Sequence, residues 1–528
     1  MTVEQANPTN TQPDAEQAPT PAGASLTART ASGFVWLAAR TVATKGLAFV
    51  TQIVLAYLLV PADFGLVGLA YTFAAFANLI SQAGLRQVLI QQHDQFATHQ
   101  RAALWLSVVA GVSGALLIAA LTPVAAALYD EPRLVAVMLT LALAPPVEAL
   151  GIVPRAKMES AMRFRFLAGM EVSVAVLQAA ITITLASMGF GALAVVAPRP
   201  IVSTLRTVTM WMASGVGFPG GPTTRGWRTL LSGSLAIIGA TFAYTATMQG
   251  DYLLLGVFYD TAVVGMYYFA FNLSMQSVAL FTTNMQAVLL PALSNIKFDQ
   301  RRQAQAMTRS AAALSAIASP IVLWLACAGG PLIRTIFDPK WADAGVIFSI
   351  LNLAVIGRML GAPASDLVQA QGRYRAYFLM HLTSALVFFP VVGFSVWVGR
   401  AEGAAVGVLV HAWIYALMMH LVAMRPTALC FRRHVWNVVG PVAAALVAFA
   451  PFYGISRLIG WQSPQADVVK TLLMLALGGL SYLAIVRVWS KSTVNELIEQ
   501  IASHLPARFA NRLLVCRPRL HPHAQIAE

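Results

Sequence analysis

The stretch Asp63-Phe64-Gly65-Leu66 recurs in looser form about 200 residues later as Val263-Val264-Gly265-Met266. Ala70 and Ala270 follow the two stretches at matching positions. Two further pairs keep the same order, at offsets of about 208 and 210 residues: Tyr129-Asp130 with Phe337-Asp338, and Met162-Arg163-Phe164-Arg165 with Gly372-Arg373-Tyr374-Arg375. Three matches in register predict two similar halves, and in a membrane protein this architecture is typical of a transporter.

The composition excludes a water-soluble body. Of the 528 residues, 58% are hydrophobic and only 11% are charged, whereas a soluble protein carries about 25% charged residues. The chain must therefore be solvated by lipid. The net charge of +14 does not indicate nucleic acid as a partner, because the basic residues lie in short loops between apolar runs and form no basic patch.

The cysteines and the N-terminal segment give no sign of a cofactor. Cys327, Cys430 and Cys516 are far apart and belong to no ligand-like cluster, so we expect inert thiols, no metal site and no cofactor. Residues 1–32 are rich in Pro, Thr, Gln, Asn and Ala, which predicts a disordered cytoplasmic tail. This tail has no basic region followed by an apolar run, so a cleaved signal peptide is not expected.

About fourteen apolar runs are long enough to cross a bilayer core of about 30 Å as helices. They lie near 33–58, 64–90, 102–128, 134–153, 166–187, 191–213, 230–257, 262–290, 308–333, 345–371, 376–398, 403–424, 435–458 and 467–489. Most Lys and Arg residues outside these runs follow even-numbered spans or lie near the chain ends, which predicts that both termini are cytoplasmic. That orientation requires an even number of spans, so twelve remains an alternative to fourteen.

The repeats divide the spans into an all-α polytopic architecture of two pseudo-symmetric six-helix bundles. Each repeat is shifted by six spans, so the halves share one orientation and are related by an axis along the membrane normal. We expect an N-terminal bundle at 33–213, a cytoplasmic linker at 214–229, a C-terminal bundle at 230–424 and two additional helices at 435–489. Residues 490–528 form a cytoplasmic tail whose amphipathic helix lies on the membrane surface or packs against cytoplasmic loops.

Nine charged residues lie inside apolar spans. Each costs about 2.5–3.5 kcal/mol at a helix centre, so these side chains must face the bundle interior, water or a counter-ion. The favoured interpretation is a cationic, water-filled cavity between the bundles, and the alternative is snorkelling or structural pairing. The cations are Arg40, Lys45, Arg199, Arg206 and Arg358, and the carboxylates are Asp251, Glu148, Glu171 and Asp366.

Helical spacing groups some of these residues on common faces. Arg199 and Arg206 share one face of their span, where two guanidinium groups can clamp a phosphate. Asp251 is a candidate for ion coupling or for pairing with an arginine, and a structural salt bridge is the alternative. Two polar stripes are expected to line the cavity, formed by Tyr244 and Thr247 and by Asn272 and Gln276.

The chain also lacks the features of an enzyme. No loop between spans exceeds about twenty residues, and no Walker, GxSxG or HExxH motif occurs. We therefore expect no catalytic activity and no ATP-driven transport by this chain alone. Energy would come from an ion gradient, the membrane potential or the substrate gradient.

Several short motifs, in order from about residue 33 to 400, resemble the O-antigen and exopolysaccharide flippases of the multidrug/oligosaccharidyl-lipid/polysaccharide exporter superfamily. No single motif is specific to these proteins, but the order of the motifs along the chain is specific. They are Ala56-Tyr57-Leu58-Leu59-Val60-Pro61-Ala62-Asp63-Phe64-Gly65, Ala83-Gly84-Leu85 before Leu89-Ile90-Gln91, Met162-Arg163-Phe164, 251–256 leading to Gly265 and Tyr267, Leu290-Pro291-Ala292-Leu293-Ser294, Ile336-Phe337-Asp338-Pro339-Lys340-Trp341, and Gln369-Ala370-Gln371-Gly372-Arg373.

This resemblance implies two bundles arranged in a V, which work by alternating access in the bacterial inner membrane. It implies an undecaprenyl-diphosphate-linked oligosaccharide as cargo, with the diphosphate against cavity arginines, and a polysaccharide polymerase and export machinery as partners. Arg206 and Asp251 stand where such proteins often carry these residue types. Ala56-Tyr57 departs from the usual Ala-Arg, and Arg199 beside two prolines is not a family feature, which leaves open which cations touch the diphosphate.

Other functions remain as alternatives. A drug/cation antiporter of the same superfamily would need an anionic cavity, and a peptidoglycan-precursor flippase would share the fourteen-span layout. A membrane polysaccharide polymerase or ligase would need a large outer loop, which the chain lacks.

Overall fold

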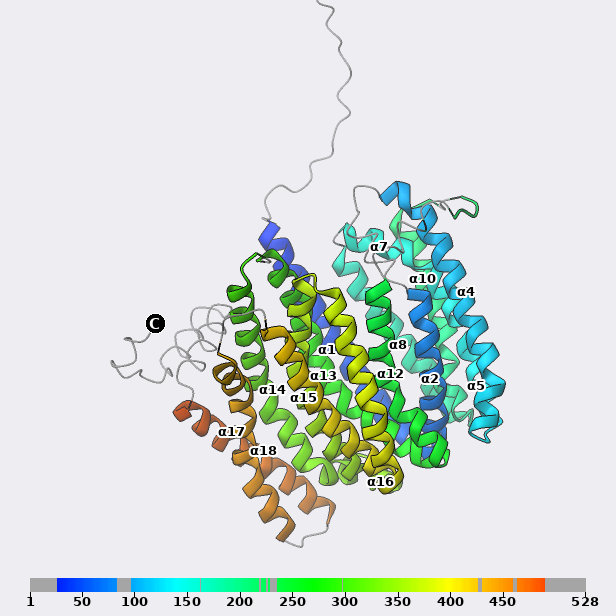
Figure 1. Ribbon diagram of the computed structural model, residues 1–528. Coiled ribbons are helices and arrows are strands. Elements are labelled where there is room, and N and C mark those ends of the chain that lie inside the picture. The colour runs from blue at the N-terminus through cyan, green and yellow to red at the C-terminus, as the bar shows by residue number, and fades with distance from the viewer. Residues whose placement is uncertain are drawn as a thin grey trace, which may run out of the picture.

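The computed structural model describes residues 26–82, 96–161, 163–217, 220–224, 227, 235–296, 298–425, 430–458 and 463–489. Residues 1–25 of the predicted tail at 1–32, the predicted tail at 490–528, the end of the second span and part of the linker at 214–229 lie outside these ranges. The described residues form helices joined by short connections (Figure 1). An all-α polytopic fold is thus confirmed.

The N-terminal half begins with long helices and ends with broken ones. The first is α1 (Leu26–Leu58), which starts in a polar segment before its apolar run. Proline accounts for two of the later starts, since it stands in the first turn of α6 and of α10. The remaining helices are α2 (Pro61–Gln82), α4 (Phe96–Leu128), α5 (Arg133–Ala142), α6 (Ala144–Leu150), α7 (Ile152–Ser160), α8 (Phe164–Ser187), α9 (Leu193–Val196) and α10 (Pro198–Ser214).

The C-terminal half consists of longer helices. α16 contains non-helical backbone at Gly399 and Arg400, which divides it into the two spans predicted there. The helices are α12 (Leu235–Phe258), α13 (Thr261–Asn295), α14 (Gln300–Ile336), α15 (Ala344–Ala370), α16 (Tyr374–Met424), α17 (Phe431–Leu458) and α18 (Pro464–Trp489), with a 3₁₀ turn at Pro339–Trp341.

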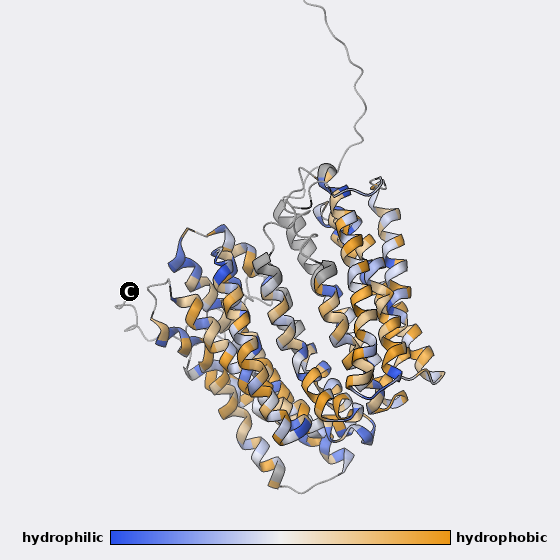
Figure 2. Ribbon diagram, turned by 45° about the vertical axis from the view of Figure 1, so that its right-hand side comes forward, coloured by the Kyte–Doolittle hydropathy of each residue, from blue (hydrophilic) through white to orange (hydrophobic). Residues whose placement is uncertain are grey.

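Within the described residues, ten helices are long and apolar enough to cross a membrane. One of these ten is α16, which covers two predicted spans, while α10, α12 and α13 coincide with three further predicted spans. A count of fourteen remains a prediction. Figure 2 shows hydrophobic residues along the middle of the helices and hydrophilic residues gathered towards their ends, as a lipid environment requires.

The two halves meet at the repeated glycines. Gly65 near the start of α2 lies against Gly265 near the start of α13, and this approach tolerates no side chain. A Cβ atom on Gly65 would collide with the carbonyl of Thr261, and one on Gly265 would collide with the carbonyl of Pro61. The repeat that divides the sequence into halves is therefore also the contact between them.

Aromatic side chains close the same end of the molecule. Trp341, which is fully buried, stacks on Phe269 with ring centroids 4.1 Å apart and donates a 2.8 Å hydrogen bond to the carbonyl of Ala56. Phe64 packs edge-on against both rings. The ribbons of the two halves approach each other at one end and diverge towards the other (Figure 2). On the orientation predicted from Lys and Arg, the closed end faces outward.

The two helices predicted as an addition to the C-terminal bundle are α17 and α18. α17 and α18 pack on α14 and on each other, at the outside of the molecule in Figure 1. The Tyr482 hydroxyl donates a 2.7 Å hydrogen bond to the carbonyl of Ala316, and the Trp324 indole donates one of 3.0 Å to the carbonyl of Thr471. Arg334 forms an ion pair with Asp467, 2.9 Å between Nε and Oδ2. Side-chain hydrogen bonds and an ion pair therefore fix the added pair to the core.

Candidate functional site

A cluster of charged residues lies inside the N-terminal half. Arg199 on α10 donates a 3.2 Å hydrogen bond from Nε to Oε1 of Glu148 on α6. Arg206, two helical turns further, lies with Nη2 3.9 Å from the same oxygen. The two arginines therefore share a face, as their spacing predicts, and both approach one carboxylate.

Tyr71 of α2 completes this cluster. The guanidinium of Arg199 lies over its ring, 5.7 Å from the centroid. Tyr71 is ten residues into α2, roughly 15 Å from the start of that helix and so near the middle of a bilayer core. The side chains of Arg199, Arg206 and Glu148 are 26%, 25% and 22% exposed, so solvent or a ligand reaches them.

The other predicted charges of the N-terminal half lie elsewhere. Glu171 forms an ion pair of 3.1 Å with Arg155, which also binds Glu159 at 3.0 Å. Arg40 and Lys45 lie half-buried on α1, which packs against α8 of its own half and α13 of the other. These two cations therefore belong to a helix that touches both halves.

Both Asn272 and Gln276 lie on α13, and Gln276 contacts α1. Gln276 donates a 3.3 Å hydrogen bond to the side chain of Gln52, which in turn donates one to the carbonyl of Phe269. The Asn272 amide donates to the carbonyl of Tyr268, one turn back on its own helix. Neither residue lines the cavity described below.

Asp251 is fully buried in the C-terminal half. Its Oδ2 accepts a 2.7 Å hydrogen bond from the Tyr267 hydroxyl, and its Oδ1 accepts one of 3.0 Å from the backbone N–H of Tyr252. Burial and these donors fix the carboxylate in place. Asp251 lies on the same helix as Tyr244 and Thr247, but it does not line the cavity that they line.

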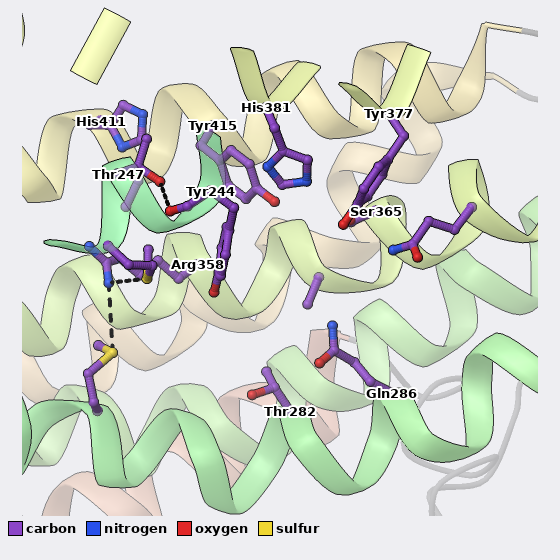
Figure 3. Close-up of a pocket in the computed structure, with 15 residues that line it drawn as sticks. Tyr244, Thr247, Thr282, Gln286, Arg358, Ser365, Tyr377, His381, His411 and Tyr415 are labelled. Carbon is purple, nitrogen blue, oxygen red and sulfur yellow. Dashed lines mark hydrogen bonds between the residues drawn. The ribbon is translucent and has the colours of Figure 1, made fainter. Parts of the chain in front are cut away.

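A cavity of about 260 Å³ lies within the C-terminal half, between α12, α13, α15 and α16. Three predicted residues line it: Arg358, Tyr244 and Thr247. Figure 3 shows side chains from α12 and α16 pointing towards Thr282 and Gln286 of α13, with Arg358 at one end. Asp366 lies buried directly after the lining residue Ser365, and its Oδ2 has no hydrogen-bond partner among the described residues.

Sequence reasoning missed most of the polar lining of this cavity. Two buried histidines, His381 and His411, line it, as do Tyr377 and Tyr415. The histidines carried a usable signal, because an ionisable side chain inside an apolar span indicates a functional site as an arginine does. The tyrosines carried none, since a ring at helical spacing is usually core.

The structure therefore distributes the predicted set over two sites, the helices α1 and α13, and two separate pairs, Glu171 with Arg155 and Asp251 with Tyr267. The single cationic cavity expected between the halves does not hold all five cations. Arg199 and Arg206 belong to the N-terminal cluster and Arg358 to the C-terminal cavity, because each half folds around its own polar residues. Among the described residues, no group of three His, Cys, Asp or Glu side chains could hold a metal ion.

Comparison with known proteins places the chain in a family. The sequence profile of the family described as polysaccharide biosynthesis protein matches residues 54–346. The chain is 23% identical to the succinoglycan biosynthesis transport protein ExoT of Rhizobium meliloti, over 89% of this chain and 95% of the relative. It is also 23% identical to the lipopolysaccharide biosynthesis protein WzxC of Escherichia coli, over 83% and 90% of the two chains.

Solved structures show the same fold. The inward closed conformation of the lipid II flippase MurJ superposes with a TM-score of 0.66 at 12% identity, covering 84% of this chain and 98% of that chain. An inward-facing multidrug resistance MATE transporter superposes with a TM-score of 0.58 at 12% identity, covering 74% and 96%. The fold is thus that of a two-lobed membrane transporter, and because the profile matches more than half of the chain, the protein belongs to the polysaccharide biosynthesis protein family.

Proposed function

We propose that this protein is a flippase that moves undecaprenyl-diphosphate-linked oligosaccharide repeat units across the bacterial inner membrane for exopolysaccharide, capsule or O-antigen synthesis. Family membership, the two-lobed transporter fold and the names of the relatives support this function. The observation that carries the choice of a phosphate-bearing cargo is the pair of arginines near the middle of the membrane.

The charge balance of the cluster favours an anion. Arg199 and Arg206 together carry two positive charges against the single negative charge of Glu148. Glu148 serves as the resting counter-ion. A diphosphate offers several oxygens to both guanidinium groups and forms charge-assisted, bidentate hydrogen bonds that a single carboxylate oxygen does not.

The contact between the halves suits alternating access. The glycines Gly65 and Gly265 and the ring of Trp341 close one end. Opening that end requires the halves to separate at this contact, while the other end closes. Because glycine and aromatic packing is specific, the closed state is a discrete arrangement and not one of a continuum.

Two other functions are less well supported. A drug/cation antiporter would need an anionic site, whereas both sites here contain arginine. Transport of a peptidoglycan precursor shares the fold through MurJ, but the relatives that match most of the sequence carry polysaccharide names. We infer that the chain performs no catalysis itself, that both termini are cytoplasmic, and that a polysaccharide polymerase and export machinery receive the cargo.

The test uses a strain in which the gene is deleted. We expect lipid-linked oligosaccharide to accumulate on the inner leaflet, where an impermeant sugar-modifying reagent reaches it only in inverted vesicles. Restoring the wild-type gene should return the oligosaccharide to the outer leaflet. An unchanged leaflet distribution after deletion would refute flipping, and accumulation of a peptidoglycan precursor instead would favour the alternative.

A further inference from the structure

The cavity of the C-terminal half combines aromatic rings with hydrogen-bonding groups. His381 lies at the centre of the rings, edge-on to Tyr377 at 4.6 Å and to Tyr244 at 5.6 Å between centroids. Tyr415 lies 6.0 Å from the same ring. Ser365, Gln286 and Thr247 supply hydroxyl and amide groups around them (Figure 3). The cavity thus offers apolar faces and polar edges side by side.

Two buried nitrogens in this cavity have no hydrogen-bond partner among the described residues. They are Nε2 of His381, whose side chain is 3% exposed, and Nη2 of Arg358. Within the described part of the chain, the neighbouring Nη1 of Arg358 forms hydrogen bonds to sulfur alone, Sδ of Met248 at 3.3 Å and Sδ of Met275 at 3.7 Å. Thioether sulfur is a weak acceptor, and buried polar groups normally find partners, so these nitrogens indicate a ligand with oxygen atoms.

The chemistry of the lining narrows the class of ligand. A cation is disfavoured because Arg358 is the charged residue of the lining. A lipid chain would leave the unpaired nitrogens and the hydroxyl groups without partners. A sugar ring fits, since its C–H faces pack on aromatic rings while its hydroxyls both donate and accept hydrogen bonds at the edge.

The size of the cavity sets how much of a cargo it holds. Its volume of about 260 Å³ is many times what a single water molecule needs. This space accommodates a sugar ring. The remaining sugars would extend out of the cavity into the space between the halves.

We propose that the C-terminal cavity is a sugar subsite, which binds one sugar residue of the oligosaccharide while the N-terminal cluster binds the diphosphate. This inference rests on the proposed function, because it assigns the cavity to the same cargo. The two ends of the cargo are then held by different halves of the protein. Cargo recognition therefore has an anionic part, common to all undecaprenyl diphosphates, and a sugar part that selects the repeat unit.

The experiment measures binding of two lipids to the purified full-length protein in detergent. One is undecaprenyl diphosphate without sugar, and the other is the undecaprenyl-diphosphate-linked oligosaccharide extracted from the deletion strain. We expect His381→Phe, which keeps a ring and removes both nitrogens, to weaken binding of the sugar-bearing lipid by about tenfold. Binding of the sugar-free lipid should not change. Tyr377→Phe, which removes only a hydroxyl, should weaken the same binding by a smaller factor.

Tyr374→Phe serves as the matched control, because Tyr374 begins the same helix and is 46% exposed outside the cavity. Equal weakening for both lipids, or none for the sugar-bearing lipid in either variant, would overturn the sugar subsite. Failure of the proposed function has a different signature, since the wild-type protein would then bind neither lipid. Arg206→Ala should weaken binding of both lipids, which separates the two sites.

Discussion

The two halves contain repeated positions in the same order but carry different polar residues at their sites. Each half places a guanidinium over a ring of its second helix, Arg199 over Tyr71 at 5.7 Å and Arg358 over Phe271 at 5.2 Å. The two rings are related by the same offset of about 200 residues that relates Gly65 to Gly265. The rings are thus repeated, whereas the two cations, 159 residues apart, come from non-equivalent helices.

The difference lies in the position of the charges. Glu148 and Arg358 are separated by the offset of 210 residues that relates Met162 to Gly372, so the repeat holds an acid in one half and a base in the other. In the N-terminal half the acid balances two arginines, and the result is a charged cluster. In the C-terminal half the base contacts methionine sulfur, and a cavity lies beside it. Opposite charges at one repeated position thus suit different parts of a cargo.

The largest expected effect comes from disrupting the glycine contact between the halves. Gly65→Val should abolish export, because its side chain would collide with the carbonyl of Thr261 and prevent the closed end from forming. Cysteine labelling of the outward end should show a protein fixed open on that side. Gly169→Ala is the control, since a Cβ there meets no atom within 4 Å. Normal export by Gly65→Val would show that this contact is not part of the transport cycle.

The next largest effect concerns the N-terminal cluster. Arg206→Ala should reduce export at least about tenfold, since a charge-assisted hydrogen bond to phosphate contributes about 1.5–3 kcal/mol. The measurement is polymer yield at matched amounts of folded membrane protein. Glu148→Arg gives the N-terminal half the residue type that the C-terminal half has at the repeated position. This substitution should abolish export, because three positive charges would then repel one another. Unchanged export in both variants would remove the cluster from the transport path.

A smaller effect is expected at the histidine pair that links α17 to the rest of the C-terminal half. His434 on α17 links to His420 on α16 at 2.9 Å and to the Thr308 hydroxyl of α14 at 2.8 Å. His420 Nε2 must carry hydrogen because it faces the carbonyl of Leu360 at 3.0 Å, so in its neutral form Nδ1 accepts from His434. His434→Ala leaves the buried Nδ1 of His420 without this partner and should destabilise the protein by about 1–3 kcal/mol.

Thermal unfolding of the purified protein measures this change, with export largely retained because the pair lies outside both sites. Leu446→Ala on the same helix is a control, since Leu446 is 45% exposed to the lipid side. A melting temperature equal to that of the wild-type protein would show that the histidines do not hold α17 in place.

The smallest effect belongs to the loop before α5. Arg133 donates a 2.9 Å hydrogen bond from Nε to Glu131, and this bond lowers the pKa of the Glu131 carboxyl. A lowered folded-state pKa means that the pair stabilises the protein above the unfolded-state pKa and loses this effect as the pH falls through the folded-state pKa. Because Arg133 is 60% exposed, Arg133→Ala should cost less than about 1 kcal/mol at neutral pH. The difference in unfolding free energy should vanish in acid, and a difference that persists there would have another cause.

The sequence predicts the helices better than it predicts the contacts between them. Apolar helices and the shared face of Arg199 and Arg206 follow from apolar length and helical spacing, and the structure agrees for ten membrane-length helices among the described residues and for the two arginines. The pairing of Glu171 with Arg155, and the burial of Asp251 under Tyr267, did not follow. Both depend on which helices become neighbours, and spacing along one helix does not contain that information.

The sequence by itself determined that the chain is a membrane protein with many spans and with internally repeated motifs. Hydrophobic length and charge are properties of each segment alone, so they can be read without the tertiary structure. Only the tertiary structure decided that Gly65 meets Gly265, that Glu148 lies between two arginines, and that a cavity opens beside Arg358. These features arise where helices from different parts of the chain meet, and the energies that select one packing from many act between residues far apart in the sequence.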